Sequence, residues 1–260
     1  MIKKKKKRFK SKKKKKLIVI SIILGILLAC WLIFKILMVN AYHSIDSVDK
    51  FFDSFNTRIY YSVNSNYSGD DLFEYTDNIK FKNYIDDSFK KSEISTLKSD
   101  GKAFSYSASS KKTAINVGEE YSYVEMFKEE LDYFTDDHML EMFNINTKKR
   151  EKLLKENNIK NDIDFFTYVK YVNNTDISIF TPIYKIEELA SVKLFSSVVL
   201  PEIDSFWVLE GDLEGYTLVN KDFKEIVILK DNKKYFIGIF GKQFNSTVFE
   251  ELLSSLEITD

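Results

Sequence analysis

The chain has 260 residues, of which 39 are basic and 39 acidic, so its formal charge is zero. This length allows one or two folded domains. The single cysteine, Cys30, excludes a fold held together by intramolecular disulfides. The sequence also lacks the P-loop, GxGxxG and GxSxG motifs, which argues against the nucleotide-binding and hydrolase classes that use them.

Charge is distributed very unevenly along the chain. Residues 1–16 contain twelve of the basic residues and no acidic one, whereas the part after Val39 contains 26 basic and 39 acidic residues. This asymmetry indicates two electrostatic environments, and a membrane is the simplest boundary between them. The abundance of Lys, Asn, Ile, Phe and Tyr is typical of a bacterium with an AT-rich genome.

An apolar run begins directly after the basic segment. It contains 18 consecutive uncharged residues, Leu17 to Phe34, and resumes after Lys35 as far as Val39. About 20 such residues in a helix cross a hydrocarbon core of roughly 30 Å, so the run predicts one transmembrane helix. The residues that mark the predicted span are Leu17, Gly25, Cys30, Trp31 and Val39.

The flanking charges predict the orientation of this helix. Twelve basic residues precede it and few follow closely, so the positive-inside rule places the N-terminus in the cytoplasm and the rest of the chain outside. Lysine side chains next to a bilayer meet lipid headgroups. The predicted headgroup contacts are Lys12, Lys13, Lys14, Lys15, Lys16 and Lys35. Since no nucleic-acid module accompanies the basic run, we expect membrane lipids as its partner and no nucleic acid.

Two alternatives keep the chain on the same side of the membrane. A cleaved secretory signal normally has a shorter apolar region of 7 to 15 residues. A lipoprotein is the second alternative, because residues 27–30, Leu-Leu-Ala-Cys, resemble a lipobox whose cysteine, Cys30, would be acylated. The apolar residues that follow Cys30, from Trp31 to Phe34, favour an uncut helix over both.

Helical and strand patterns follow one another after the membrane. Apolar residues at helical spacing predict a juxtamembrane helix within 40–57, capped by Ser44 or Asp46. Alternation then predicts a strand from Ile59 to Val63 and a hairpin over 104–117, with a further strand at Tyr121 to Val124. Short helices are expected between residues 126 and 169, one of them ending at Asn157-Asn158 and the next capped by Asn161 or Asp162.

The C-terminal third is predicted to be mainly strands. The expected strands cover 191–200, 205–210, 215–220, 224–230 and 234–240, with a tight hairpin at Asp231-Asn232. Connections this short predict antiparallel neighbours. A capping-box pattern at Thr247 to Glu250 then predicts a helix that covers one face of the sheet.

The predicted fold is therefore of the α+β class. It consists of one N-terminal transmembrane helix and an extracytoplasmic domain with a mainly antiparallel sheet, short central helices and a C-terminal covering helix. The predicted divisions are a polybasic cytoplasmic tail (1–16), the transmembrane helix (17–39), the juxtamembrane helix (40–57) and the extracytoplasmic domain (58–260).

No catalytic pattern stands out in this sequence. The chain has two histidines, and the group Asp136, Asp137 and His138 would need further ligands from elsewhere to bind a metal. Its acids more readily form the polar first turn of a helix capped by Thr135. We therefore expect no cofactor and a non-enzymatic binding, scaffold or sensor domain at a bacterial envelope, with an envelope protein, peptide or glycan as ligand. The alternative is an envelope hydrolase that uses carboxylates.

Overall fold

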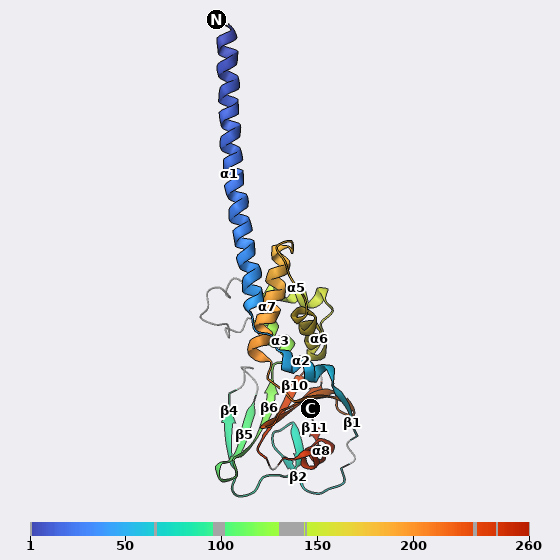
Figure 1. Ribbon diagram of the computed structural model, residues 1–260. Helices are drawn as coiled ribbons and strands as arrows, with labels where there is room; N and C mark the ends of the chain where they lie inside the picture. The colour runs from blue at the N-terminus through green and yellow to red at the C-terminus, as the bar shows by residue number, and fades with distance from the viewer. Residues whose placement is uncertain are drawn as a thin grey trace.

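A computed structural model describes residues 2–64, 67–95, 102–129, 143, 145–230, 233–242 and 244–259. Within this part the protein is α+β, with seven α-helices and a mixed sheet of eight strands (Figure 1). The helices are α1 (Ile2–Ser44), α2 (Asp49–Asn56), α3 (Tyr123–Lys128), α5 (Thr147–Glu156), α6 (Asp162–Asn173), α7 (Ile183–Val199) and α8 (Ser246–Ser254). The strands are β1 (Ile59–Val63), β2 (Leu72–Glu74), β3 (Ile79–Lys82), β4 (Lys90–Ile94), β5 (Ala103–Ala108), β6 (Thr113–Glu120), β7 (Ser205–Gly211), β8 (Gly215–Val219), β9 (Phe223–Lys230), β10 (Lys233–Phe240) and β11 (Glu257–Ile258).

The large sheet has the order β1-β7-β8-β9-β10-β6-β5-β4. Strands β7 to β10 form the predicted antiparallel meander, and β5 and β6 form the predicted hairpin. Among the described strands, β1 and β7 are the one pair that runs parallel, which makes the sheet mixed. Strands β2, β3 and β11 form a second, smaller sheet that the sequence did not predict.

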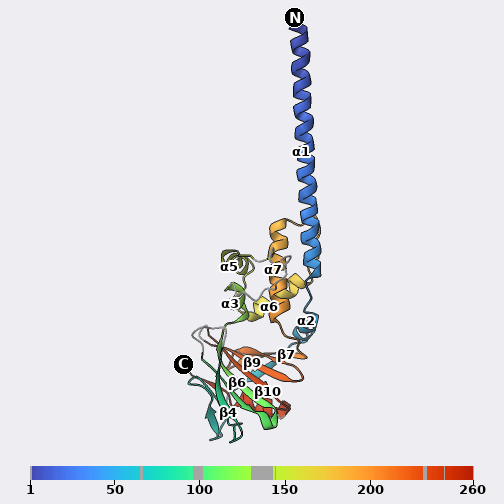
Figure 2. The ribbon, with the colours of Figure 1, turned by 90° about the vertical axis from the view of Figure 1, so that its left-hand side faces the viewer.

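The large sheet lies between two covering layers. One face packs against α2, α3, α5, α6 and α7 through a core that includes Phe51, Phe166, Phe206 and Tyr216. The other face packs against α8 and the small sheet. In Figures 1 and 2 the first group of helices lies between α1 and the sheet, so α1 and the sheet occupy opposite ends of the molecule.

Helix α7 replaces a strand that the sequence predicted. Residues 191–200 alternate and end in Val198-Val199-Leu200, a pattern that favours a strand when it is considered alone. The structure has one helix from Ile183 to Val199 instead. Buried residues lie on several sides of α7, so the helix lacks a clear polar face. Its sequence therefore shows little of the alternation of apolar and polar residues that identifies a surface helix.

Three other predicted boundaries also differ from the structure. Residues 121–124 are not a strand, because the side chain of Ser122 forms a capping box with Glu125 and starts α3. Helix α8 starts with Asn245 as its N-cap, before the predicted box at Thr247. The juxtamembrane helix is divided, since α1 continues to Ser44 and α2 begins after Val48 without a side-chain cap.

Some predictions about helix and turn residues can be compared directly with the structure. Asn161 caps α6 as predicted, and α5 ends at Glu156, directly before Asn157-Asn158. The turn residues Asp231-Asn232 lie outside the described residues, although the strands on either side of them pair as an antiparallel hairpin.

Candidate membrane anchor and ligand pockets

Residues 18–34 of α1, where the structure describes the side chains, do not pack against the folded domain. Every residue from Ile18 to Phe34 is exposed, including Leu28 at 66% and Trp31 at 47%. Gly25 and Cys30 lie in this stretch, and the Cys30 thiol is free. A core helix of a soluble protein would be covered here, so this exposed apolar surface is that of a membrane anchor or a signal sequence.

By length and composition, the segment Ile18–Ser44 can cross a membrane. Among the described residues it is the one helix that meets this criterion, and it lies near the N-terminus. A membrane anchor and a signal sequence share these properties of length and hydropathy.

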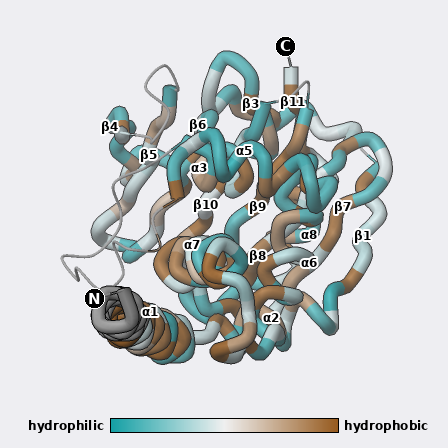
Figure 3. Tube along the Cα trace, turned by 90° about the horizontal axis from the view of Figure 1, so that it is seen from above, coloured by the Kyte–Doolittle hydropathy of each residue, from teal (hydrophilic) through white to brown (hydrophobic). Residues whose placement is uncertain are grey.

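Burial of α1 begins at Lys35 and continues to Ile45. The buried positions in this stretch are Lys35, Met38, Ala41, Tyr42 and Ile45, each at most 5% exposed. Their spacing of three or four residues forms one face, of which Met38, Ala41, Tyr42 and Ile45 belong to the core of the helical layer. Figures 1 and 3 show α1 at the side of the folded domain, next to α7. The change from exposed to buried residues therefore falls between Phe34 and Lys35, inside the predicted 17–39 span.

Tyr42 fixes this end of α1 to the domain. Its one hydroxyl proton is shared between the carbonyl oxygens of Val172, at 2.9 Å, and Thr175, at 3.0 Å. Burial, with a smaller contribution from Asp176, raises the pKa of Tyr42 to about 12, so the phenol stays protonated and keeps donating. The ammonium of Lys193 on α7 lies 3.4 Å from the Tyr42 carbonyl oxygen and 4.9 Å from its ring centroid.

The structure describes only part of the predicted lipid-contact set. Lys35 is 4% exposed, and its ammonium lies 4.9 Å from the centroid of the Trp31 ring. The backbone of Lys12 to Lys16 continues α1, and their side chains lie outside the described part of the chain, as does that of Leu17. Val39 is half-buried against the helical core. The group Asp136, Asp137 and His138, with the predicted cap Thr135, also lies outside the described residues.

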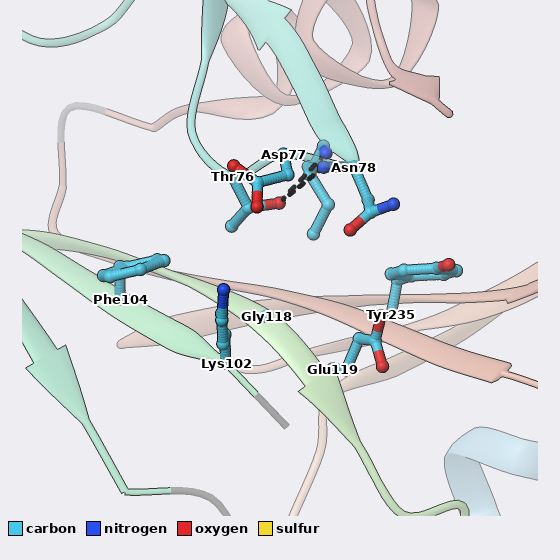
Figure 4. Close-up of a pocket in the computed structure, with 9 residues that line it drawn as sticks. Thr76, Asp77, Asn78, Lys102, Phe104, Gly118, Glu119 and Tyr235 are labelled. Atoms are coloured by element: carbon cyan, nitrogen blue, oxygen red, sulfur yellow. Dashed lines mark hydrogen bonds between the residues drawn. The ribbon is translucent and has the colours of Figure 1, made fainter. Parts of the chain in front are cut away.

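A pocket of about 220 Å³ opens between the small sheet and the large one (Figure 4). The β2–β3 turn supplies Thr76, Asp77 and Asn78 on one side, where the Thr76 hydroxyl accepts hydrogen bonds from the backbone N–H groups of Asn78 and Ile79. On the other side, Phe104 and Tyr235 flank Lys102 and Glu119. Apolar rings combined with a few polar groups are the usual lining of a small-ligand site.

A second polar feature is the buried carboxylate of Asp162, at the start of α6. Its two oxygens accept hydrogen bonds from the Tyr216 hydroxyl at 2.7 Å and from the Val124 backbone N–H at 3.1 Å. Burial raises the pKa of Asp162, while Lys234 and these hydrogen bonds oppose the shift. Burial likewise raises the pKa of Glu225 on β9, and Lys234 again opposes the change.

The contacts of Asp162 explain its role without any chemistry on a substrate. The carboxylate connects the start of α6 to the first turn of α3 and to strand β8, because it accepts hydrogen bonds from the Val124 N–H and the Tyr216 hydroxyl. An adjacent pocket of about 390 Å³ includes Asp162, Glu125, Lys160 and Lys234 in its lining. The sequence identified Asp162 only as a possible cap, because a local pattern does not reveal burial by distant elements.

Among the described residues, no three side chains of His, Cys, Asp or Glu gather into a group that could hold a metal ion. No family model, no curated protein and no solved structure matches this chain. The features of this chain that bear on function are therefore the exposed apolar stretch of α1 and its junction with the folded domain.

Proposed function

We propose that this protein is a single-pass membrane protein whose folded part is a non-enzymatic binding or scaffold domain on the outer side of a bacterial cell membrane. The observation that carries the proposal is the sharp change along α1. An apolar stretch exposed from Ile18 to Phe34 continues without a break into residues that are part of the domain core. In a lipid bilayer the apolar side chains of such a stretch are surrounded by hydrocarbon and are no longer exposed to water.

The proposed topology assigns each part of the chain to one side. Residues 1–16 form the cytoplasmic tail, 17–39 the span, 40–57 the juxtamembrane segment and 58–260 the outer domain. The asymmetry in Lys and Arg supports this orientation. Because burial starts at Lys35, we place the outer edge of the hydrocarbon core near this residue, with Trp31 close to the interface.

The continuity of α1 also supports an intact anchor over a cleaved one. A cut near Ala29, or acylation at Cys30, would leave the exposed apolar residues Trp31 to Phe34 at the new N-terminus. Such a short stub could neither cross a bilayer nor pack in the core, whereas the uncut helix keeps these residues in lipid.

Thiol labelling of full-length protein in intact bacterial cells tests the topology. In a Cys30→Ser background, an impermeant maleimide should label Lys221→Cys directly and Ser11→Cys only after permeabilisation. Tags at both ends should remain on one polypeptide in the membrane fraction. The reverse labelling pattern, or loss of the N-terminal tag, would contradict the proposed anchor.

The ligand that best fits this proposal is an envelope peptide or glycan in the pocket of Figure 4, since polar groups and aromatic rings face each other there. We expect a Phe104→Ser variant to bind cell-wall fragments more weakly than the natural chain. Phe240→Ser is the control, and the affinities of both variants for the fragments test whether this pocket is used. Equal binding to both variants would exclude it.

A further inference from the structure

The loop between α6 and α7 carries the most exposed apolar side chain that the structure describes. Phe180 is 87% exposed, and its neighbours Ile179 and Tyr184 are 38% and 64% exposed. No charged residue occurs from Ile177 to Tyr184, in a chain of which 30% is charged. Exposure of such apolar side chains to water is unfavourable in free energy unless a partner covers them.

This loop lies at the end of the folded domain that faces the exposed part of α1. Figure 1 shows the start of α7 as the part of the folded domain that reaches furthest along α1 toward its N-terminus. Lys193 of α7 meets Tyr42 of α1, and Ile183 lies about ten residues, or roughly 15 Å, further up α7. The same distance up α1 from Tyr42 leads to the level of Leu32, within the exposed apolar stretch.

The backbone of the loop is suited to an apolar environment. Thr181 N–H donates to the Ser178 carbonyl oxygen at 3.0 Å, and Ser178 N–H donates to the Thr181 hydroxyl at 3.1 Å. Phe180 N–H donates to the Ser178 hydroxyl at 3.2 Å, and Pro182 has no N–H to satisfy. These bonds remove much of the penalty for taking a turn out of water, and they hold Ile179 and Phe180 at its tip.

We propose that the Ser178–Pro182 turn inserts Ile179 and Phe180 into the outer interface of the bilayer that α1 crosses. This inference rests on the proposed membrane anchor. The turn then acts as a second contact, which together with α1 fixes the tilt of the domain on the membrane. Tyr184, on the first turn of α7, lies at headgroup level, where tyrosine is favoured.

Site-directed labelling of the full chain in nanodiscs tests this contact. Three single-cysteine variants in a Cys30→Ser background carry an environment-sensitive fluorophore: Phe180→Cys at the turn, Gly25→Cys in the span and Asp222→Cys on an exposed loop of the sheet. Emission from position 180 should shift to the blue and be quenched by lipid-borne quenchers, as at position 25. Emission from position 222 should remain that of a probe in water.

Each outcome separates the turn from the anchor. A probe in water at position 180 but in lipid at position 25 would overturn the turn contact and leave the anchor intact. Water at both positions would overturn the anchor itself. A blue shift at position 180 that disappears when the protein is diluted into excess lipid would identify a second copy as the occupant and overturn the lipid contact. Adding Ile179→Glu should return the position 180 probe to water.

Discussion

The Tyr42 hydroxyl forms a polar link between α1 and the rest of the folded domain. It satisfies the carbonyl oxygens of Val172 and Thr175, which lie at and just beyond the end of α6. A Tyr42→Phe variant keeps the ring but removes this hydrogen bond, while the Val172 oxygen still accepts from the Thr175 N–H at 3.0 Å. We therefore expect a loss of about 1 kcal/mol in the free energy of unfolding. Denaturant titration of detergent-solubilised protein measures this. Tyr184→Phe, at an exposed position, should change stability by less than about 0.5 kcal/mol, and an equal effect in both variants would refute the link.

At the same scale, the buried carboxylate of Asp162 makes stability depend on pH. Its pKa is higher in the folded protein than its ordinary value of 3.8, mainly because of burial, so the folded state binds this proton more readily than the unfolded state. Its contribution to stability is therefore present in acid and is lost as pH rises from about 3.8 through the raised pKa. The groups that face it, Lys234 and Glu225, remain in an Asp162→Asn variant.

The Asp162→Asn variant should consequently gain stability relative to the natural chain as pH rises through this window. Unfolding free energies measured for both proteins at a series of pH values give the difference directly. A difference that stays constant with pH, or that falls as pH rises, would mean that burial does not raise the pKa of Asp162 in the folded protein.

At the scale of elements, the parallel pairing of β1 with β7 depends on Gly211. This residue has φ of +119°, and an added Cβ would lie 2.3 Å from the Val63 carbonyl oxygen. We expect Gly211→Ala to destabilise the domain by more than about 1 kcal/mol, because both the backbone conformation and the strand contact resist the methyl group. Gly238 on β10 is the matched control, since its nearest atom would be 3.5 Å away. Thermal unfolding that ranks Gly238→Ala as the more damaging change would contradict this reading of the sheet edge.

Elements with strong local signals were predictable from the sequence. The meander β7 to β10, the β5–β6 hairpin and α6 follow turn and cap residues that act within a few positions, such as Asn161. Helix α7 was not, because a buried helix loses its polar face and its β-branched C-terminal end resembles a strand. The parallel β1–β7 pair joins residues about 150 positions apart, as Ile59 and Trp207 show, and no local pattern encodes such a contact.

The candidate site was predictable to a similar extent. The apolar run in the sequence predicted the exposed stretch of α1, because hydropathy is a property of the local sequence. The burial of Met38 and Tyr42 against the helical layer was not visible in the sequence, because it depends on how that layer packs beside α1. The absence of charge around Phe180 can be read from the sequence, but the proposed lipid contact depends on where the turn lies relative to α1, which only the structure shows.

At the scale of the whole molecule, the distribution of charge should determine which way the chain crosses the membrane. Twelve basic residues precede the span, and only Lys50 and Arg58 lie within the twenty residues that follow Val39. Acidic residues contribute little to this choice, so the excess of acidic residues after Val39 does not set the orientation by itself. Replacing all twelve basic residues with Gln therefore removes the dominant signal and should invert a substantial fraction of the molecules.

Accessibility of Ser11→Cys to an impermeant maleimide in intact cells measures the inverted fraction. Replacing the eleven lysines of the tail with arginine keeps the charge and should leave the cysteine protected, which separates a charge effect from one specific to lysine. Full protection in the Gln variant would mean that the folded domain, and not the tail, sets the topology. In that case the remaining role of the polybasic segment would be contact with anionic lipid, which attracts such a cluster by about 1 kcal/mol per residue.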